Sequence, residues 1–74
     1  ALEVAGAQVS ALRREAGALE LRVFNPTPEP TTVHVAARSG WLVDLRGRPL
    51  ARFDGSFPLG PWAIATARLD GAGG

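Results

Sequence analysis

The chain has 74 residues, eight arginines against seven carboxylates for a formal net charge of +1, one histidine and no cysteine. This length suffices for one small domain, and the arginines alternate with carboxylates without a basic cluster longer than Arg13-Arg14, so we expect no nucleic-acid partner. The pI of about 9.3 adds no argument for such a partner, because the lack of lysine, tyrosine and cysteine leaves little that titrates between histidine and arginine.

Other features of the composition suggest a part of a larger protein. A domain of this size buries only about 60% of the surface of its unfolded chain, and no disulfide can compensate, so we infer a core that packs very well or a partner that supports it. The absence of methionine and the Gly-Ala-Gly-Gly ending favour a piece of a longer chain, with residues 1–6 and 70–74 as flexible tails. No apolar run approaches the roughly 18 residues of a membrane span, and residues 1–7 lack a signal-peptide pattern, so we expect no membrane partner and a cytoplasmic location.

Turn residues recur roughly every eight to twelve positions, which predicts a small antiparallel β-sandwich of about six or seven short strands. Residues 7–15 form the first predicted strand, closed by a turn at Ala16-Gly17. Residues 18–25 are the clearest strand, because apolar and polar side chains alternate. One face carries Leu19, Leu21 and Val23, and the other carries Glu20, Arg22 and Phe24.

A corner rich in proline follows. Pro26, Pro28 and Pro30 donate no backbone hydrogen bond, so residues 25–30 must connect strands rather than continue one. Asn25 precedes the first proline and is expected to cap the turn with its side chain. We interpret this corner as architecture rather than as a binding site.

The second half of the chain predicts further strands. In residues 31–37, inward and outward side chains alternate, with Val33 and Val35 directed inward and His34 outward. Residues 39–45 place Trp41, Val43 and Leu45 on one side, which predicts that this side belongs to the core. Residues 49–53 read as a short edge segment and Asp54-Gly55 as a turn, and residues 62–69 form a last strand that is apolar on both faces.

We predict no catalytic residue and no metal ligand. His34 is the only candidate base, and no serine has the surroundings of a nucleophile; one histidine cannot seed a zinc site. Asp44 on the polar side of its strand and Asp54 in a turn both have structural explanations. Two aromatic side chains, Phe24 and Trp62, are the candidate contacts to a neighbouring domain or a sugar, Phe24 because it lies on an otherwise polar face.

Three stretches taken together resemble one known family. They are the aromatic-Asn-Pro-Thr corner at residues 24–30, the sequence LVDLRGRPL at 42–50 and the sequence LGPWAIATARL at 59–69. Their order and spacing are similar to those of the C-terminal β-domain of glycoside hydrolase family 38, the zinc-dependent retaining α-mannosidases. Ala63 and Trp62 depart from that family's pattern, which has an acidic and a smaller residue at these positions.

The resemblance implies that residues 1–74 are a single accessory β-sandwich domain from an α-mannosidase-like enzyme of mannose metabolism. Such a domain is not an enzyme by itself; its partner would be the catalytic domain of the same parent chain, on which it would dock and which it would stabilise. The zinc ion would belong to that catalytic domain, so no cofactor is expected here. An alternative is an independent carbohydrate-binding or adhesion module of immunoglobulin-like build, and a third is an unrelated structural β-domain.

Overall fold

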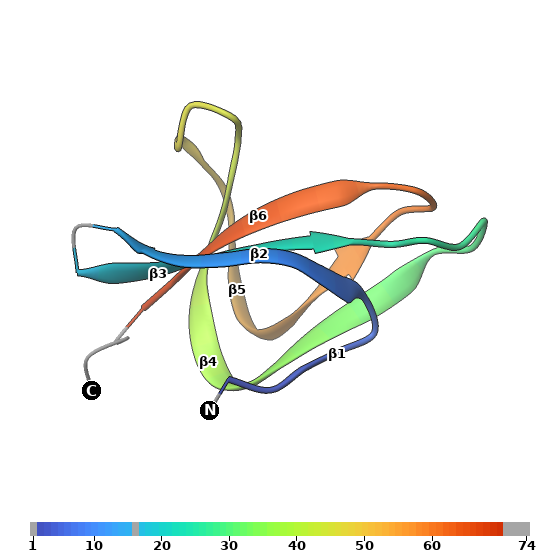
Figure 1. The fold of residues 1–74 in the computed structure, drawn as a ribbon, viewed down its shortest axis with the longest axis horizontal. Coiled ribbons are helices and arrows are strands. Elements are labelled where there is room, and N and C mark those ends of the chain that lie inside the picture. The colour runs from blue at the N-terminus through green and yellow to red at the C-terminus, as the bar shows by residue number, and fades with distance from the viewer. Residues whose placement is uncertain (1, 16, 71–74) are drawn as a thin grey trace.

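The computed structural model describes residues 2–15 and 17–70 and contains, in that part of the chain, six β-strands and no helix (Figure 1). The strands are β1 (Val4–Ala5), β2 (Gln8–Glu15), β3 (Ala18–Phe24), β4 (Thr31–Val43), β5 (Pro49–Leu59) and β6 (Ile64–Leu69). All pairings are antiparallel, in the order β1-β4-β6-β3-β2 with β5 also paired to β4. The predicted all-β, antiparallel fold is confirmed. Within the described residues, no helix is long and apolar enough to span a membrane.

The strongest alternating patterns in the sequence form the core. Leu21 and Val23 of β3 and Val33 and Val35 of β4 are all fully buried, as their alternation predicts. The remaining members of the core cluster come from β5 and β6: Phe53, Phe57, Leu59, Ala67 and Leu69. The rings of Phe53 and Phe57 meet edge to face with centroids 4.9 Å apart, an arrangement that stabilises an aromatic pair beyond the area it buries.

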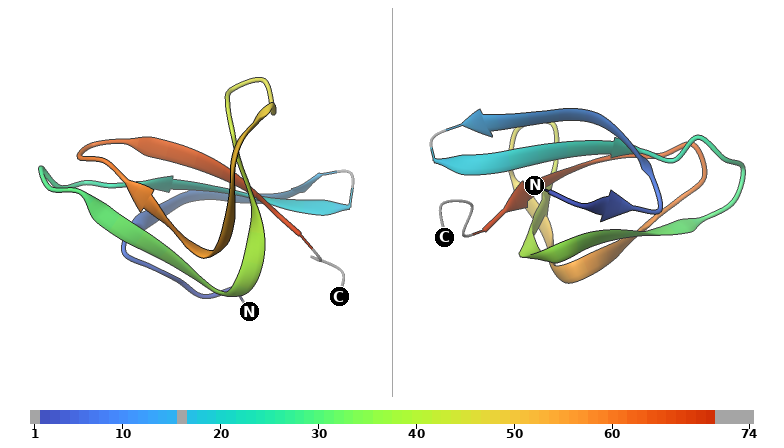
Figure 2. Two further views of the ribbon diagram at one scale, coloured as in Figure 1. Left: turned by 180° about the vertical axis from the view of Figure 1, so that it is seen from behind. Right: turned by 60° about the horizontal axis from the view of Figure 1, so that its bottom comes forward.

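Strand β4 bends sharply and pairs with three other strands of the sheet (Figures 1 and 2). Its first half pairs with β1 and the end of β5, and its second half pairs with β6 and the start of β5. The register shifts between His34 and Ser39, where four residues of β4 stand opposite the single Gly55 of β5. A bulge of this kind bends a strand and increases its twist. The two strands predicted at residues 31–37 and 39–45 are therefore one continuous strand.

The bulge also reverses which side chains of β4 point inward. Val33 and Val35 are buried before it, whereas Gly40 is buried and Leu42 packs against the core after it. Trp41 is consequently 41% exposed, and Leu45, beyond the end of the strand, is 97% exposed. The predicted core position is therefore wrong for Trp41, because an odd number of extra residues in the bulge moves the side chains that follow it to the other face. It is wrong for Leu45 as well, which lies in the turn beyond the strand. It is confirmed for Val43, which is 6% exposed and follows a second register shift between Leu42 and Val43.

Strand β5 continues through Asp54-Gly55, so the turn predicted there is wrong as well. Gly55 has a φ of +83°, a conformation that glycine adopts without steric cost, and it lets β5 follow the bend of β4. Pro49 and Pro58 lie within β5, which among the described strands pairs only with β4. Prolines are tolerated there because the missing N–H groups can face the free edge.

The N-terminal segment, predicted to be a tail, contains β1, in which Val4 and Ala5 pair with Val35 and His34 of β4. The predicted turn at Ala16-Gly17 lies partly outside the described residues, as does most of the predicted C-terminal tail.

The proline-rich corner is held by the buried side chain of Asn25, which is 1% exposed. Its Oδ1 accepts hydrogen bonds from the backbone N–H (3.1 Å) and the hydroxyl (2.7 Å) of Thr27. Its Nδ2 donates to the carbonyl of Glu29 at 2.7 Å and to that of Gly60 at 2.9 Å. The predicted cap is thus present, and the bond to Gly60 in addition ties the β3–β4 loop to the β5–β6 loop.

Candidate docking surface

In the described part of the chain, no hydrogen bond or ion pair joins the side chains considered for catalysis to one another. His34 is exposed on β4, with Ser56 of β5 as its cross-strand partner. Asp44 Oδ1 accepts hydrogen bonds from the backbone N–H groups of Arg46 (2.8 Å) and Arg48 (2.9 Å), so this carboxylate closes a turn. In residues 2–15 and 17–70, no three His, Asp or Glu side chains gather as a metal site would require.

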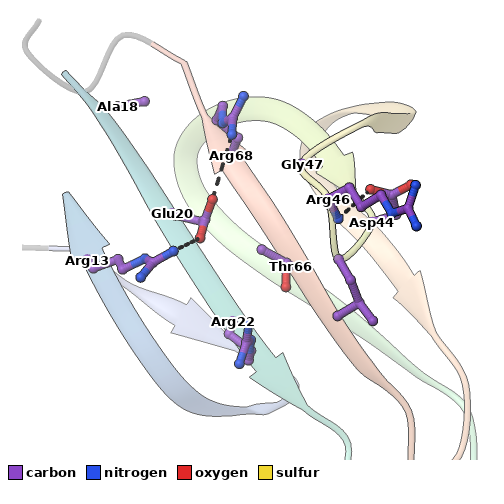
Figure 3. Close-up of a pocket in the computed structure, with 10 residues that line it drawn as sticks. Arg13, Ala18, Glu20, Arg22, Asp44, Arg46, Gly47, Thr66 and Arg68 are labelled. Carbon is purple, nitrogen blue, oxygen red and sulfur yellow. Dashed lines mark hydrogen bonds and ion pairs between the residues drawn. The ribbon is translucent and has the colours of Figure 1, made fainter. Parts of the chain in front are cut away.

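The most distinct surface feature is an open groove on the outer face of β2, β3 and β6, closed on one side by the β4–β5 loop (Figure 3). We call it the arginine groove. Its charged lining residues are Arg13, Arg22, Arg46, Arg68, Glu20 and Asp44. Four arginines and two carboxylates give the groove a formal net charge of +2, whereas the whole chain carries +1. The rest of the domain therefore has a net charge of −1, and the positive charge is concentrated in the groove.

Strand register creates the groove by aligning residues from distant parts of the sequence. Glu20 of β3 stands opposite Arg13 of β2 on one side and Arg68 of β6 on the other. Paired side chains of antiparallel strands project from the same face, so the three form a row. Glu20 Oε1 lies 3.2 Å from an Arg13 nitrogen and Glu20 Oε2 lies 3.7 Å from an Arg68 nitrogen (Figure 3). The carboxylate thus holds two guanidinium groups along the groove.

In the next row of described side chains along the groove, no carboxylate balances the positive charge. Arg22 of β3 stands opposite Thr66 of β6 and is exposed. Within the described part of the chain, the ion pairs of carboxylates with arginines involve Arg13, Arg52 and Arg68, and none involves Arg22 or Arg46. These two side chains leave uncompensated charge in the groove.

An apolar margin adjoins the arginine groove. Leu45 is 97% exposed on the β4–β5 loop, and Leu50 and Ile64 are 67% and 65% exposed. All three line a second pocket that shares Arg22 and Thr66 with the arginine groove. Charged and apolar surfaces are therefore continuous on this side of the molecule.

The two predicted contact residues lie at one end of the molecule. Phe24 is half-buried at the end of β3, opposite Ile64 of β6. Trp62 is 58% exposed in the β5–β6 loop and has a φ of +57°. The backbone there forms a turn in which Ala63 N–H donates to the Gly60 carbonyl at 3.2 Å. A second bond, from Trp62 N–H to the Thr27 carbonyl at 3.2 Å, fixes the loop against the proline-rich corner.

Trp41, the other tryptophan, lies on the outer face. Its cross-strand partners are Arg52 of β5 and Arg68 of β6. The Arg52 guanidinium carbon is 5.7 Å from the centre of the Trp41 ring, within the range of a cation–π interaction. Arg52 also forms an ion pair with Asp70. One face of the indole is thus in contact with an arginine.

The molecule belongs to the class of antiparallel β-domains and carries a charged outer groove. Residues 5–67 match the family described as D-apionate lactonase, C-terminal immunoglobulin-like domain. The chain belongs to this family and is an immunoglobulin-like C-terminal domain of a larger enzyme. Comparison with curated proteins and with solved structures finds no match.

This family corrects the identification suggested by the sequence motifs. The parent is of the lactonase type, and the assignment to glycoside hydrolase family 38 and to α-mannosidases is wrong. The motifs behind that assignment are solutions to local turn geometry: Asn25 caps a corner, and Pro61 precedes Trp62 in a tight turn. Unrelated β-sandwiches need the same turns. The zinc ion expected in the parent rested on the mannosidase resemblance alone and loses its basis with it.

Proposed function

We propose that this chain is the non-catalytic C-terminal domain of a lactonase that acts on the lactone of D-apionate, and that it packs against and stabilises the catalytic part of that enzyme. The family match over residues 5–67 carries this proposal. The arrangement of side chains supports it, because His34 is an exposed strand residue and Asp44 is used in a turn.

The exposed apolar side chains give the docking part of the proposal its physical basis. Leu45, Leu50, Trp62 and Ile64 are each more than half exposed in a domain whose core is small. Contiguous exposed apolar surface commonly marks a protein interface, and burying it against a second domain would add to a marginal stability. We retain Phe24 and Trp62 as proposed contacts with the catalytic part.

The test compares the full-length parent enzyme, the parent without this domain, and the 74-residue chain alone. Lactone hydrolysis is followed by acid release and stability by thermal unfolding. We expect no turnover by the isolated chain. The shortened enzyme should unfold at a temperature lower by roughly 5–10 °C, as for a loss of about 2–3 kcal/mol. Turnover by the isolated chain would refute the non-catalytic assignment, and an unchanged unfolding temperature would refute the stabilising role.

The alternative of an independent carbohydrate-binding module rests on the exposure of Trp62. A titration of the isolated chain with D-apionate or mannose, followed by tryptophan fluorescence, separates the two functions. A saturable response that disappears in Trp62→Ala would favour sugar binding over docking.

A further inference from the structure

We propose that the arginine groove, together with its apolar margin, is the surface through which the domain docks, and that its occupant is a carboxylate-bearing surface of the catalytic part of the same enzyme. This inference rests on the proposed function and adds which face docks and the chemistry of the partner surface.

Charge complementarity is the first argument. Arg22 and Arg46 line the groove and take part in none of the ion pairs with carboxylates in the described part of the chain. A partner that presents Asp or Glu side chains could engage both, and guanidinium groups bind carboxylates with two parallel hydrogen bonds. The Thr66 hydroxyl, on the strand beside Arg22, offers a further donor in the same row.

The fixed geometry of the row beside Arg22 is the second argument. Glu20 is only 16% exposed and holds Arg13 and Arg68 on either side of it. Long side chains lose rotamer freedom when they bind, and part of that loss is already incurred where a neighbouring carboxylate orients them. The groove thus presents two oriented arginines beside the uncompensated Arg22.

The composition of the surface points to a protein rather than a small anion. Leu45, Leu50 and Ile64 continue the surface from Arg22 as an apolar pocket. Protein interfaces combine arginine with apolar side chains at their centre. A free sugar acid is polar and would gain no binding energy from the apolar margin. A second copy of the chain is disfavoured, because two grooves with the same positive charge would repel each other.

The test measures the reactivity of individual arginines with phenylglyoxal, which adds to guanidinium groups, in the 74-residue chain and in the full-length enzyme. Mass spectrometry of the peptides identifies each modified arginine. We expect Arg22 and Arg46 to react about tenfold more slowly in the full-length enzyme, because an interface core excludes solvent. Arg14, exposed on β2 and outside the groove, is the matched control and should react equally in both.

A pair of charge reversals provides an independent readout. Arg22→Glu should lower the unfolding temperature of the full-length enzyme while Arg14→Glu leaves it unchanged. Both variants are also unfolded as 74-residue chains, so that any loss of stability within the domain itself is subtracted. Added salt should reduce the difference between wild type and Arg22→Glu, because screening weakens charge pairs.

The remaining outcomes overturn the proposal in distinguishable ways. Equal reactivity of Arg22 in both proteins, with protection of another face in the full-length enzyme, would show docking elsewhere and leave the proposed function intact. No protection of any part of the domain would refute docking itself. Protection of Arg22 in the isolated chain by D-apionate would identify a small carboxylate as the occupant, and concentration-dependent protection there would identify a second copy.

Discussion

Replacing Asn25 by alanine should destabilise the domain more than any other single change at the proline-rich corner. The substitution removes the two hydrogen bonds that the amide donates to the Glu29 and Gly60 carbonyls and the two that it accepts from Thr27. At about 1 kcal/mol for each bond, and with water able to reach the exposed partners, the expected loss is about 2–3 kcal/mol. The total stability expected for a domain of this length is roughly 4–11 kcal/mol.

The assay is urea denaturation of the 74-residue chain, followed by tryptophan fluorescence. The midpoint should fall while the slope stays unchanged, because the surface exposed on unfolding is nearly the same. Asn25→Asp should be at least as damaging, since it directs a carboxylate oxygen at two carbonyl groups. Thr27→Val is the milder control: it removes the hydroxyl but leaves the amide bonds to Glu29 and Gly60, so about 1 kcal/mol is expected. A loss below about 0.5 kcal/mol for Asn25→Ala would show that the amide does not hold the two loops together.

Two further predictions concern backbone conformation and close packing. At position 62, where φ is +57°, Trp62→Gly should be more stable than Trp62→Ala by about 1 kcal/mol, because a left-handed conformation is strained for every residue with a Cβ; equal midpoints in urea would contradict this. Gly40→Ala should cost about 2 kcal/mol or more, because an added Cβ would lie 2.0 Å from the Arg68 carbonyl oxygen. Gly60→Ala is the control, since nothing lies within 4 Å of its Cβ position, and a similar loss there would refute the packing argument.

The parts of the fold that sequence patterns predicted are those encoded by neighbouring residues. The alternation around Leu21 and Val23 and around Val33 and Val35 gave the core faces of β3 and β4 correctly. The cap at Asn25 also followed from a local rule, since an Asn before Pro commonly closes a turn.

What the sequence could not predict depends on how distant strands align. The bulge in β4 merges two predicted strands and exposes Trp41. Ser39 and Gly40 follow the bulge, but this local signal does not tell which side chains face inward beyond it. The arginine groove was missed because Arg13, Arg22 and Arg68 come from three strands, and only the register brings them together. The one available signal was the outward, charged face of residues 18–25, where Glu20 and Arg22 alternate with the core.

The bend in β4 has a consequence for how the domain opens and refolds. Because one continuous strand supplies hydrogen bonds to β1, β5 and β6, opening β4 breaks the pairing of all three strands together. Amide hydrogens of residues 40–43, which pair with β5 on one side and β6 on the other, should therefore exchange with deuterium only through global unfolding, at a rate set by the full free energy of the domain. Refolding must bring β3 and β6, which are separated in the sequence by the two longest strands, β4 and β5, into register, and such long loop closures make folding slow.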